Sequence, residues 1–265
     1  MLRRLPAART LLGVAMLAVA LAAGAHPEDE FCVPGEDGLD PALCEALSQL
    51  DSAETVASGA ILDAAGEPRS AWSTFGLYIT IGINHILPAG LDHILFVLAL
   101  FLTSLRARDL IIQISTFTVA HTATLGLAAA GFISPDAAIV EPIIAASIAF
   151  VAVENLFLTE MPRWRPLVVF LFGLVHGMGF AGFFGELGLP RDQFLGGLIG
   201  FNIGVEIGQL SVVALAFVLS IGVQHWMTRA DCICQYRRYV VVPLSLVIAL
   251  TGAWWSVQRT WAVLA

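Results

Sequence analysis

His85-Ile-Leu-Pro-Ala-Gly-Leu-Asp92-His93 is the stretch that decides the fold, because it places two imidazoles and a carboxylate inside a long apolar run. An ionisable side chain at the centre of a membrane span costs at least about 2.5–3.5 kcal/mol, so it usually faces the interior of a helix bundle. Pro88 and Gly90 stand between the histidines, and proline breaks or kinks a helix. A broken helix at membrane depth is tolerated only where protein buries it or where it lines a cavity. The stretch therefore predicts a polar cavity inside a membrane protein.

The composition of the whole chain agrees with a membrane protein built from helices. Of 265 residues, 58% are hydrophobic and only 13% are charged, which excludes a disordered chain and is unlike an ordinary soluble domain. The net charge is −8 and no basic stripe is present, so nucleic acid is not expected as a partner. We expect an all-α, polytopic bundle of about six transmembrane helices that has the lipid bilayer as its surroundings.

The N-terminal part divides into a leader and an acidic segment. Residues 1–25 have an arginine-rich start, an apolar run and small residues before a cleavage point, which is typical of a secretory signal peptide. An uncleaved first helix is the alternative. Residues 26–70 are polar and acidic, and we expect them outside the cytoplasm. Cys32 and Cys44 would then lie in an oxidising compartment, which favours a disulfide between them over a metal site.

Six apolar segments make up the predicted transmembrane domain, residues 71–260. The first is too long for one straight crossing, since it would measure about 48 Å against a hydrocarbon core of about 30 Å. We therefore expect a shorter piece before Pro88 and a crossing helix after it. The segments cover approximately residues 72–104, 111–131, 139–158, 167–186, 194–221 and 239–258.

Arginine placement predicts the orientation in the membrane. Arginines concentrate in alternate connections, and the arginine-rich side of a membrane protein is usually cytoplasmic. This puts residues 26–70 outside, as a signal peptide also requires, and predicts a multi-pass protein of the bacterial inner membrane. The arginines concerned are Arg106, Arg108, Arg163, Arg165, Arg229, Arg237 and Arg238.

Residues of the kind that bind metals fall at one depth in four of the segments. Counting 1.5 Å per residue from the segment ends places each about 15–18 Å inside the bilayer. Independent polar residues would not be expected to share a level. The predicted metal ligands are His85, Asp92, His93, His121, His176 and Glu206. The predicted pathway or supporting residues are Thr118, Thr122, Glu154, Asn155, Asn202 and Gln209.

The chemical types of the predicted ligands narrow the choice of metal ion more than their sequence pattern does. Imidazoles with carboxylates suit nickel, cobalt, zinc, iron or copper, whereas magnesium and calcium prefer shells made only of oxygen. Any one of these histidines could instead form only a hydrogen bond between helices. All of them together are harder to explain that way, because buried polar groups are costly.

Several motifs in order resemble the HupE/UreJ-type membrane proteins. That resemblance covers about residues 75–215 and implies a permease for nickel or cobalt, associated with the maturation of hydrogenase and urease. It further implies that His85, Asp92 and His93 are metal ligands, and that metallochaperones or metalloenzyme maturation proteins are partners. The motifs are H-x-x-P-x-G-x-D-H (85–93), F-T-x-A-H-T-x-T-L (117–125), V-E-N (153–155), F-G-L-x-H-G-x-G-F-A (172–181) and F-N-x-G-V-E-x-G-Q (201–209).

Three functions remain open from the sequence. The first is a transporter for a divalent transition metal, most simply nickel or cobalt, with the polar level near the midplane as its site. The second is a zinc-dependent intramembrane hydrolase in which histidines hold the ion and Glu206 activates a water molecule. The third is a metal-binding accessory or sensor protein. The prediction favours transport.

Overall fold

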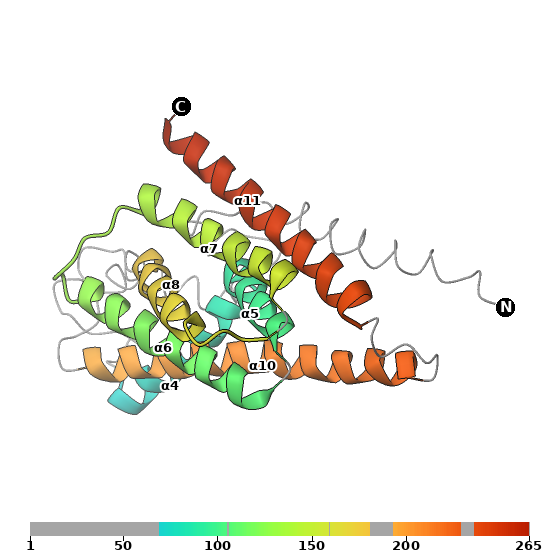
Figure 1. Cartoon of the computed structure of the whole chain (residues 1–265). Helices are drawn as coiled ribbons and strands as arrows, with labels where there is room; N and C mark the ends of the chain where they lie inside the picture. The colour runs from blue at the N-terminus through green and yellow to red at the C-terminus, as the bar shows by residue number, and fades with distance from the viewer. Residues whose placement is uncertain (1–68, 105, 159, 181–192, 229–235, 265) are drawn as a thin grey trace, which may run out of the picture.

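The computed structural model describes residues 69–104, 106–158, 160–180, 193–228 and 236–264, and within them every regular element is helical (Figure 1). The elements are α4 (Ala71–Ile86), α5 (Leu91–Thr103), α6 (Ala107–Ala129), α7 (Ala137–Phe157), α8 (Arg165–Gly179), α10 (Phe194–Thr228), the π-helical turn η3 (Arg237–Val241) and α11 (Val242–Leu264). The all-α prediction is confirmed. The predicted signal peptide, most of the acidic segment and the Cys32–Cys44 disulfide lie outside the described residues.

The first apolar segment is broken, as the sequence predicted. Helices α4 and α5 meet at an angle of 71° across a short break that contains Pro88. They have 16 and 13 residues, so neither alone reaches across a core of about 30 Å. The expected crossing helix after Pro88 was therefore wrong, because α5 is the shorter of the two pieces. Gly90 lies where the chain turns tightly, because a Cβ there would collide with the carbonyl oxygen of His85. The break brings the end of α4 close to the start of α5.

The remaining segments differ in length from one another. Helices α6, α7, α10 and the η3–α11 pair are each long and apolar enough to cross a membrane, and α4 with α5 forms one further broken span. Helix α8 has 15 residues, shorter than the predicted segment 167–186, whose last residues fall outside the described part. The chain is thus a multi-pass helical membrane protein in which one of the six apolar segments is short.

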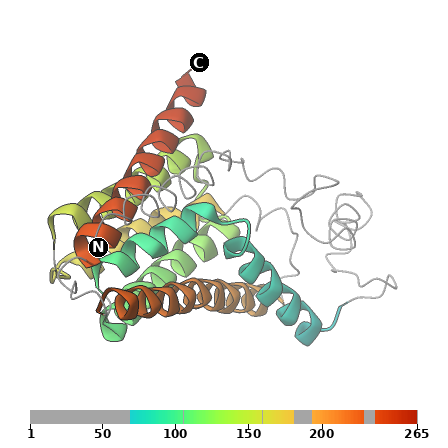
Figure 2. The same ribbon diagram turned by 90° about the vertical axis from the view of Figure 1, so that its right-hand side faces the viewer.

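Helices pack mainly in three pairs, α4 with α10, α6 with α8, and α7 with α11, while α5 lies among them (Figures 1 and 2). Glycines allow each pair to approach closely, as is common in lipid. A Cβ on Gly204 of α10 would collide with the carbonyl oxygen of Ile79, and one on Gly177 of α8 would collide with that of His121. A Cβ on Gly252 of α11 would likewise press on the backbone of α7. The first two contacts lie next to the histidines and help to bring them together.

The outer surface of the bundle is apolar. Large hydrophobic side chains remain exposed on most of the described helices, which fits a protein whose solvent is hydrocarbon rather than water. Examples, by exposed fraction, are Val119 64%, Leu167 62%, Leu215 62%, Leu250 58% and Phe150 46%. Polar side chains are instead gathered inside, where the candidate site lies.

Candidate metal site

Four histidines from four helices meet in the interior of the bundle. His85 lies in the last turn of α4 and His93 in the first turn of α5, so the break between these helices brings both rings to one place. His121 comes from the middle of α6, and His176 comes from the last turn of α8. All four side chains are buried, with at most 6% of each residue exposed. Depth counting placed His93, His121 and His176 at one level, and the structure brings these three together with His85.

The rings are close enough to contact one another. The centroids of His85 and His93 are 4.7 Å apart, and those of His93 and His176 are 5.2 Å apart. His121 lies 5.9 Å from His93 and 6.4 Å from His85. His93, which follows the helix break, thus stands at the centre of the cluster.

Three of the four histidines have the geometry of a metal-ligand group. One ring nitrogen from each of His85, His93 and His121 lies within 4.8 Å of the others. Two nitrogens bound to one ion at about 2.1 Å are at most about 4.2 Å apart, so only a small movement of the rings is needed for them to share it. We call His85, His93 and His121 the histidine triad. Its three members are neutral donors when they present a lone pair.

The triad offers nitrogen atoms that the protein itself leaves unused. Nε2 of His85 and Nε2 of His93 are buried and have no hydrogen-bond partner. Asn202 of α10 lies beside His121, but neither ring nitrogen of His121 makes an aligned hydrogen bond with it. Buried polar atoms are almost always hydrogen-bonded, and each exception calls for an explanation such as an ion or water. A metal ion supplies that explanation for several atoms at once.

Aromatic rings enclose the cluster. Phe180 and Phe201 lie 4.1 and 5.5 Å from the ring of His85, and Phe117 lies 5.9 Å from that of His93. Phe96 and Phe117 each lie 5.0 Å from His176. These apolar walls exclude water, so an ion entering the triad must exchange its hydration shell for the imidazoles.

His176 has a partner that fixes which of its nitrogens is free. Ser147 of α7 lies 2.9 Å from Nε2 of His176 and donates its single hydrogen to the carbonyl of Ile144 at 2.7 Å. The hydroxyl oxygen of Ser147 therefore accepts from Nε2, which places the proton there. Nδ1 of His176 keeps its lone pair and has no hydrogen-bond partner. The side chain is thereby oriented as a fourth, adjoining donor beside the triad.

Asp92 is placed differently from the sequence expectation that it would join the metal ligands. Its Oδ2 accepts a hydrogen bond and ion pair from Nη1 of Arg259 at 2.7 Å. The same nitrogen of Arg259 also donates to the carbonyl of Glu141 at 3.2 Å. Asp92 and Arg259 therefore tie the start of α5 to the end of α11 and the start of α7. In this structure the cation beside the Asp92 carboxylate is therefore the Arg259 guanidinium.

Glu206 is also placed outside the triad. Its carboxylate accepts a hydrogen bond of 2.5 Å from the hydroxyl of Thr118, which joins α10 to α6. Gln209 lies one turn further along α10, 3.4 Å from the same hydroxyl. Thr122 donates to the backbone of its own helix at 2.6 Å. These residues form a polar seam between α6 and α10 that runs past the helix face carrying His121.

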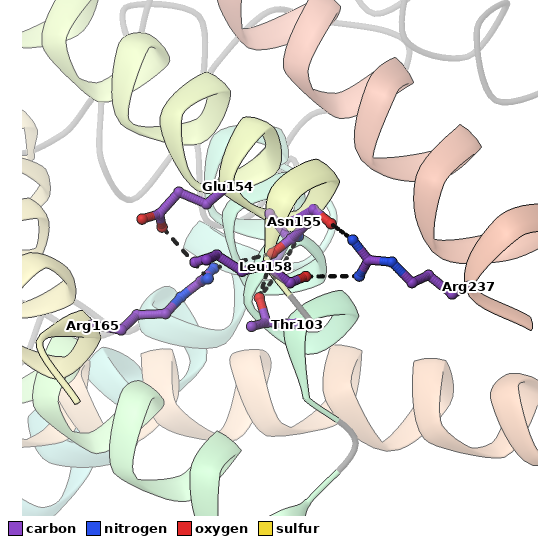
Figure 3. Close-up of polar contacts among 7 residues, drawn as sticks. Thr103, Glu154, Asn155, Leu158, Arg165 and Arg237 are labelled. Carbon is purple, nitrogen blue, oxygen red and sulfur yellow. Dashed lines mark hydrogen bonds and ion pairs between the residues drawn. The ribbon is translucent and has the colours of Figure 1, made fainter. Parts of the chain in front are cut away.

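A second polar group closes the end of the bundle where α5 and α7 end and α8 begins (Figure 3). The amide of Asn155 donates to the carbonyl of Ala99 at 2.7 Å, and its oxygen accepts from Thr103 at 2.5 Å. Arg165 is fully buried and lies 3.5 Å from Glu154 and 3.4 Å from the same amide oxygen. Arg237 caps α7 by donating to the carbonyls of Asn155, Leu156 and Leu158. Glu154 and Asn155, expected at a mouth of the path, belong to this group.

Sequence reasoning missed several residues that hold the site together. Ser147 lies in an apolar helix and has no motif around it, so nothing marked it as the partner of His176. Arg165 entered the sequence analysis only as a signal of orientation, and nothing there marked Arg259 as a partner of Asp92. A useful signal was present, however: an arginine next to an apolar segment needs a carboxylate, and Asp92 and Glu154 were available.

The comparisons with known proteins agree with the motifs. The family model described as HupE / UreJ protein matches residues 62–259, which is most of the chain. No curated protein and no solved structure gives a significant match. The family match covers all four clustered histidines and the described helices except the last residues of α11. The chain is therefore a member of the HupE/UreJ family of membrane proteins.

Proposed function

We propose that the protein carries a divalent transition metal ion across the membrane, most simply nickel or cobalt, and that the histidine triad is the intramembrane binding site. The observation that supports this most strongly is the convergence of three buried imidazoles whose ring nitrogens lie within 4.8 Å of one another. Two of them, His85 and His93, lie on either side of the break between α4 and α5, and discontinuous helices are where many transporters hold their substrate. The family suggests a permease, and the metals follow from the resemblance stated above.

The chemistry of the triad suits a passing ion better than a retained one. Imidazole is a good ligand for nickel, cobalt, zinc and copper and a poor one for magnesium or calcium. The three ligands are neutral, so the charge of a bound ion is not compensated within the triad. Both carboxylates that the sequence placed at this depth are engaged elsewhere, Asp92 with Arg259 and Glu206 with Thr118. Conduction requires binding that is weak enough to allow exit, and a neutral donor set provides it.

His176 offers the next position for the ion. Its ring lies 5.2 Å from that of His93, and its Nδ1 carries a free lone pair. If the ion passes directly from one imidazole to a neighbouring one, it keeps a ligand at every step although it has lost its water. The ion would thus move from the helix break toward α8. Net transport is expected to run inward from the side of the acidic segment, toward metallochaperones or maturation proteins in the cytoplasm.

A zinc hydrolase remains the alternative, because three histidines also form the ligand set of some catalytic zinc sites. Such an enzyme needs a general base beside the metal-bound water. Among the residues that the structure describes, the carboxylates near this depth make the hydrogen bonds given above and do not join the triad. Transport requires no such base, and we favour it for this reason.

The direct test is metal flux into liposomes that contain the purified full-length protein and a metal-sensitive dye. We expect nickel or cobalt influx from the wild type and at least a tenfold lower rate for His93→Ala, because the central ligand of the triad is lost. His225→Ala is the matched control, since this histidine lies exposed near the far end of α10. Equal rates for empty and protein-containing liposomes with nickel, cobalt and zinc would refute transport, and release of fatty acid from the lipids would favour the hydrolase.

A further inference from the structure

Arg165 is the largest fully buried side chain in the described part of the structure, and burying its charge costs free energy. It is fully buried, and a guanidinium cannot lose its charge in a protein. Its contacts are nevertheless long: 3.5 Å to Oε2 of Glu154 and 3.4 Å to Oδ1 of Asn155. Hydrogen bonds between an arginine and a carboxylate normally measure about 2.7–2.9 Å. Its Nε and Nη1 atoms make no hydrogen bond at all. The guanidinium is therefore enclosed but loosely held.

Arg237 shows what a structural arginine looks like at the same end of the bundle. It donates to three backbone carbonyls at the end of α7, at 2.7, 3.1 and 3.0 Å. The last carbonyls of a helix have no partner within the helix, so Arg237 completes the end of α7. Figure 3 shows the two arginines on opposite sides of Asn155. Arg237 thus has the short contacts of a cap, whereas Arg165 has none of them.

The groups that surround Arg165 form a set of oxygen donors. Arg165 contacts the carboxylate of Glu154 and the amide oxygen of Asn155, both on α7. The hydroxyl of Thr103, at the end of α5, contacts that same amide oxygen. The amide orientation is fixed, because its nitrogen donates to the carbonyl of Ala99 at 2.7 Å. Its oxygen must then face Thr103 and Arg165. Carboxylate, amide and hydroxyl oxygens are ligands that suit hard cations such as manganese, magnesium or calcium.

Thr103 and Arg165 lie on helices that also carry histidines of the cluster. Thr103 follows His93 by ten residues on α5, a rise of about 15 Å. Arg165 precedes His176 by eleven residues on α8, a rise of about 16 Å. A cation that leaves the histidines along α5 and α8 toward this end therefore meets a fixed positive charge. Arg165 is paired with Glu154, which is the only carboxylate described in this group.

We propose that Glu154, Asn155 and Thr103 form a second cation site, whose occupant in this state is the protein's own Arg165 guanidinium. Arg165 then acts as a tethered competitor: the site accepts a cation only when the guanidinium withdraws, and the loose contacts make withdrawal easy. The role of this site in metal transport rests on the proposed function. The existence of the site does not.

The experiment measures manganese binding to the full-length protein in detergent by electron paramagnetic resonance, with Mn²⁺ as the probe. Arg165→Gln removes the competitor, so we expect it to bind one Mn²⁺ more than the wild type, at least tenfold more tightly. Arg165→Gln/Glu154→Gln should lose that gain. Arg237→Gln is the matched control and should gain no Mn²⁺, although it loses the cap of α7. The proposal is overturned if Arg165→Gln gains no bound ion, or if the gain persists without Glu154.

Folding is checked by size-exclusion chromatography, with Arg165→Met as a second neutral variant of similar length. If Arg165 variants fold only when Glu154 is also neutralised, or do not fold at all, the guanidinium is part of the fold and the proposal is overturned. Metal flux separates the two proposals. We expect severalfold faster nickel or cobalt influx for Arg165→Gln. A wild type without flux refutes transport alone, because the Mn²⁺ titration still decides whether the second site exists.

Discussion

The ion pair between Asp92 and Arg259 leads to a prediction that separates a positioning role from a ligand role. The two atoms are 2.7 Å apart, and the side chains are 21% and 14% exposed. At an effective dielectric constant of about 20, the attraction between them is about 6 kcal/mol. Desolvation offsets most of it, and breaking a partly buried pair costs about 2 kcal/mol, because one charge is left without its partner. We therefore expect Asp92→Asn to destabilise the protein by about 2 kcal/mol.

Asp92→Asn should change the metal affinity much less than it changes the stability of the protein. If Asp92 only positions α5, Asp92→Asn changes the affinity of the triad for cobalt by a few fold. If Asp92 is a ligand, the loss is much larger, because a charged donor disappears. Stability is measured by thermal unfolding of the purified protein without metal, and affinity is measured by cobalt titration of the folded variants.

Arg259→Gln supplies the control through a double-mutant cycle. The double variant Asp92→Asn/Arg259→Gln leaves neither charge unpaired, so we expect it to recover at least half of the lost stability. An affinity loss of more than a hundredfold in Asp92→Asn, with no recovery in the double variant, would refute the positioning role and restore Asp92 to the metal ligands.

Two further predictions concern the packing that brings the histidines together. Gly204→Val should destabilise the protein by about 1–3 kcal/mol and weaken cobalt binding, because the new side chain forces α10 away from α4, which carries His85. Gly196→Val on the same helix has open space around it and should do neither; equal melting temperatures for the two variants would contradict this packing. Ser147→Ala should slow metal flux about tenfold by releasing the ring of His176. Ser147→Thr keeps a hydroxyl and should restore most of the rate, whereas unchanged flux in Ser147→Ala would exclude His176 from the path.

The fold was largely predictable because the membrane imposes simple rules. Apolar segments of sufficient length become helices, and a proline within one of them predicts the break that separates α4 from α5. The short helix α8 was not predictable, since hydropathy continues past the residue at which it ends. Hydropathy records which residues prefer lipid, and it does not record where the backbone leaves a helix.

The gathering of the histidines was predictable from the sequence, and the contacts of the carboxylates were not. Depth counting brought His93, His121 and His176 to one level, and the structure places them together. The same counting grouped Asp92 and Glu206 with them, whereas their carboxylates are bound by Arg259 and Thr118. Depth is a single coordinate. It cannot tell which way a side chain points around its helix, and partners that lie far apart in the sequence decide that.

The central claim is that imidazoles of the triad bind the metal directly. X-ray absorption spectroscopy of the cobalt-loaded protein tests it without reference to transport. We expect about three nitrogen neighbours at about 2.1 Å, with the outer-shell scattering typical of imidazole, and the loss of one such neighbour in His93→Ala. A spectrum that shows only oxygen neighbours, or one that His93→Ala leaves unchanged, would contradict the account.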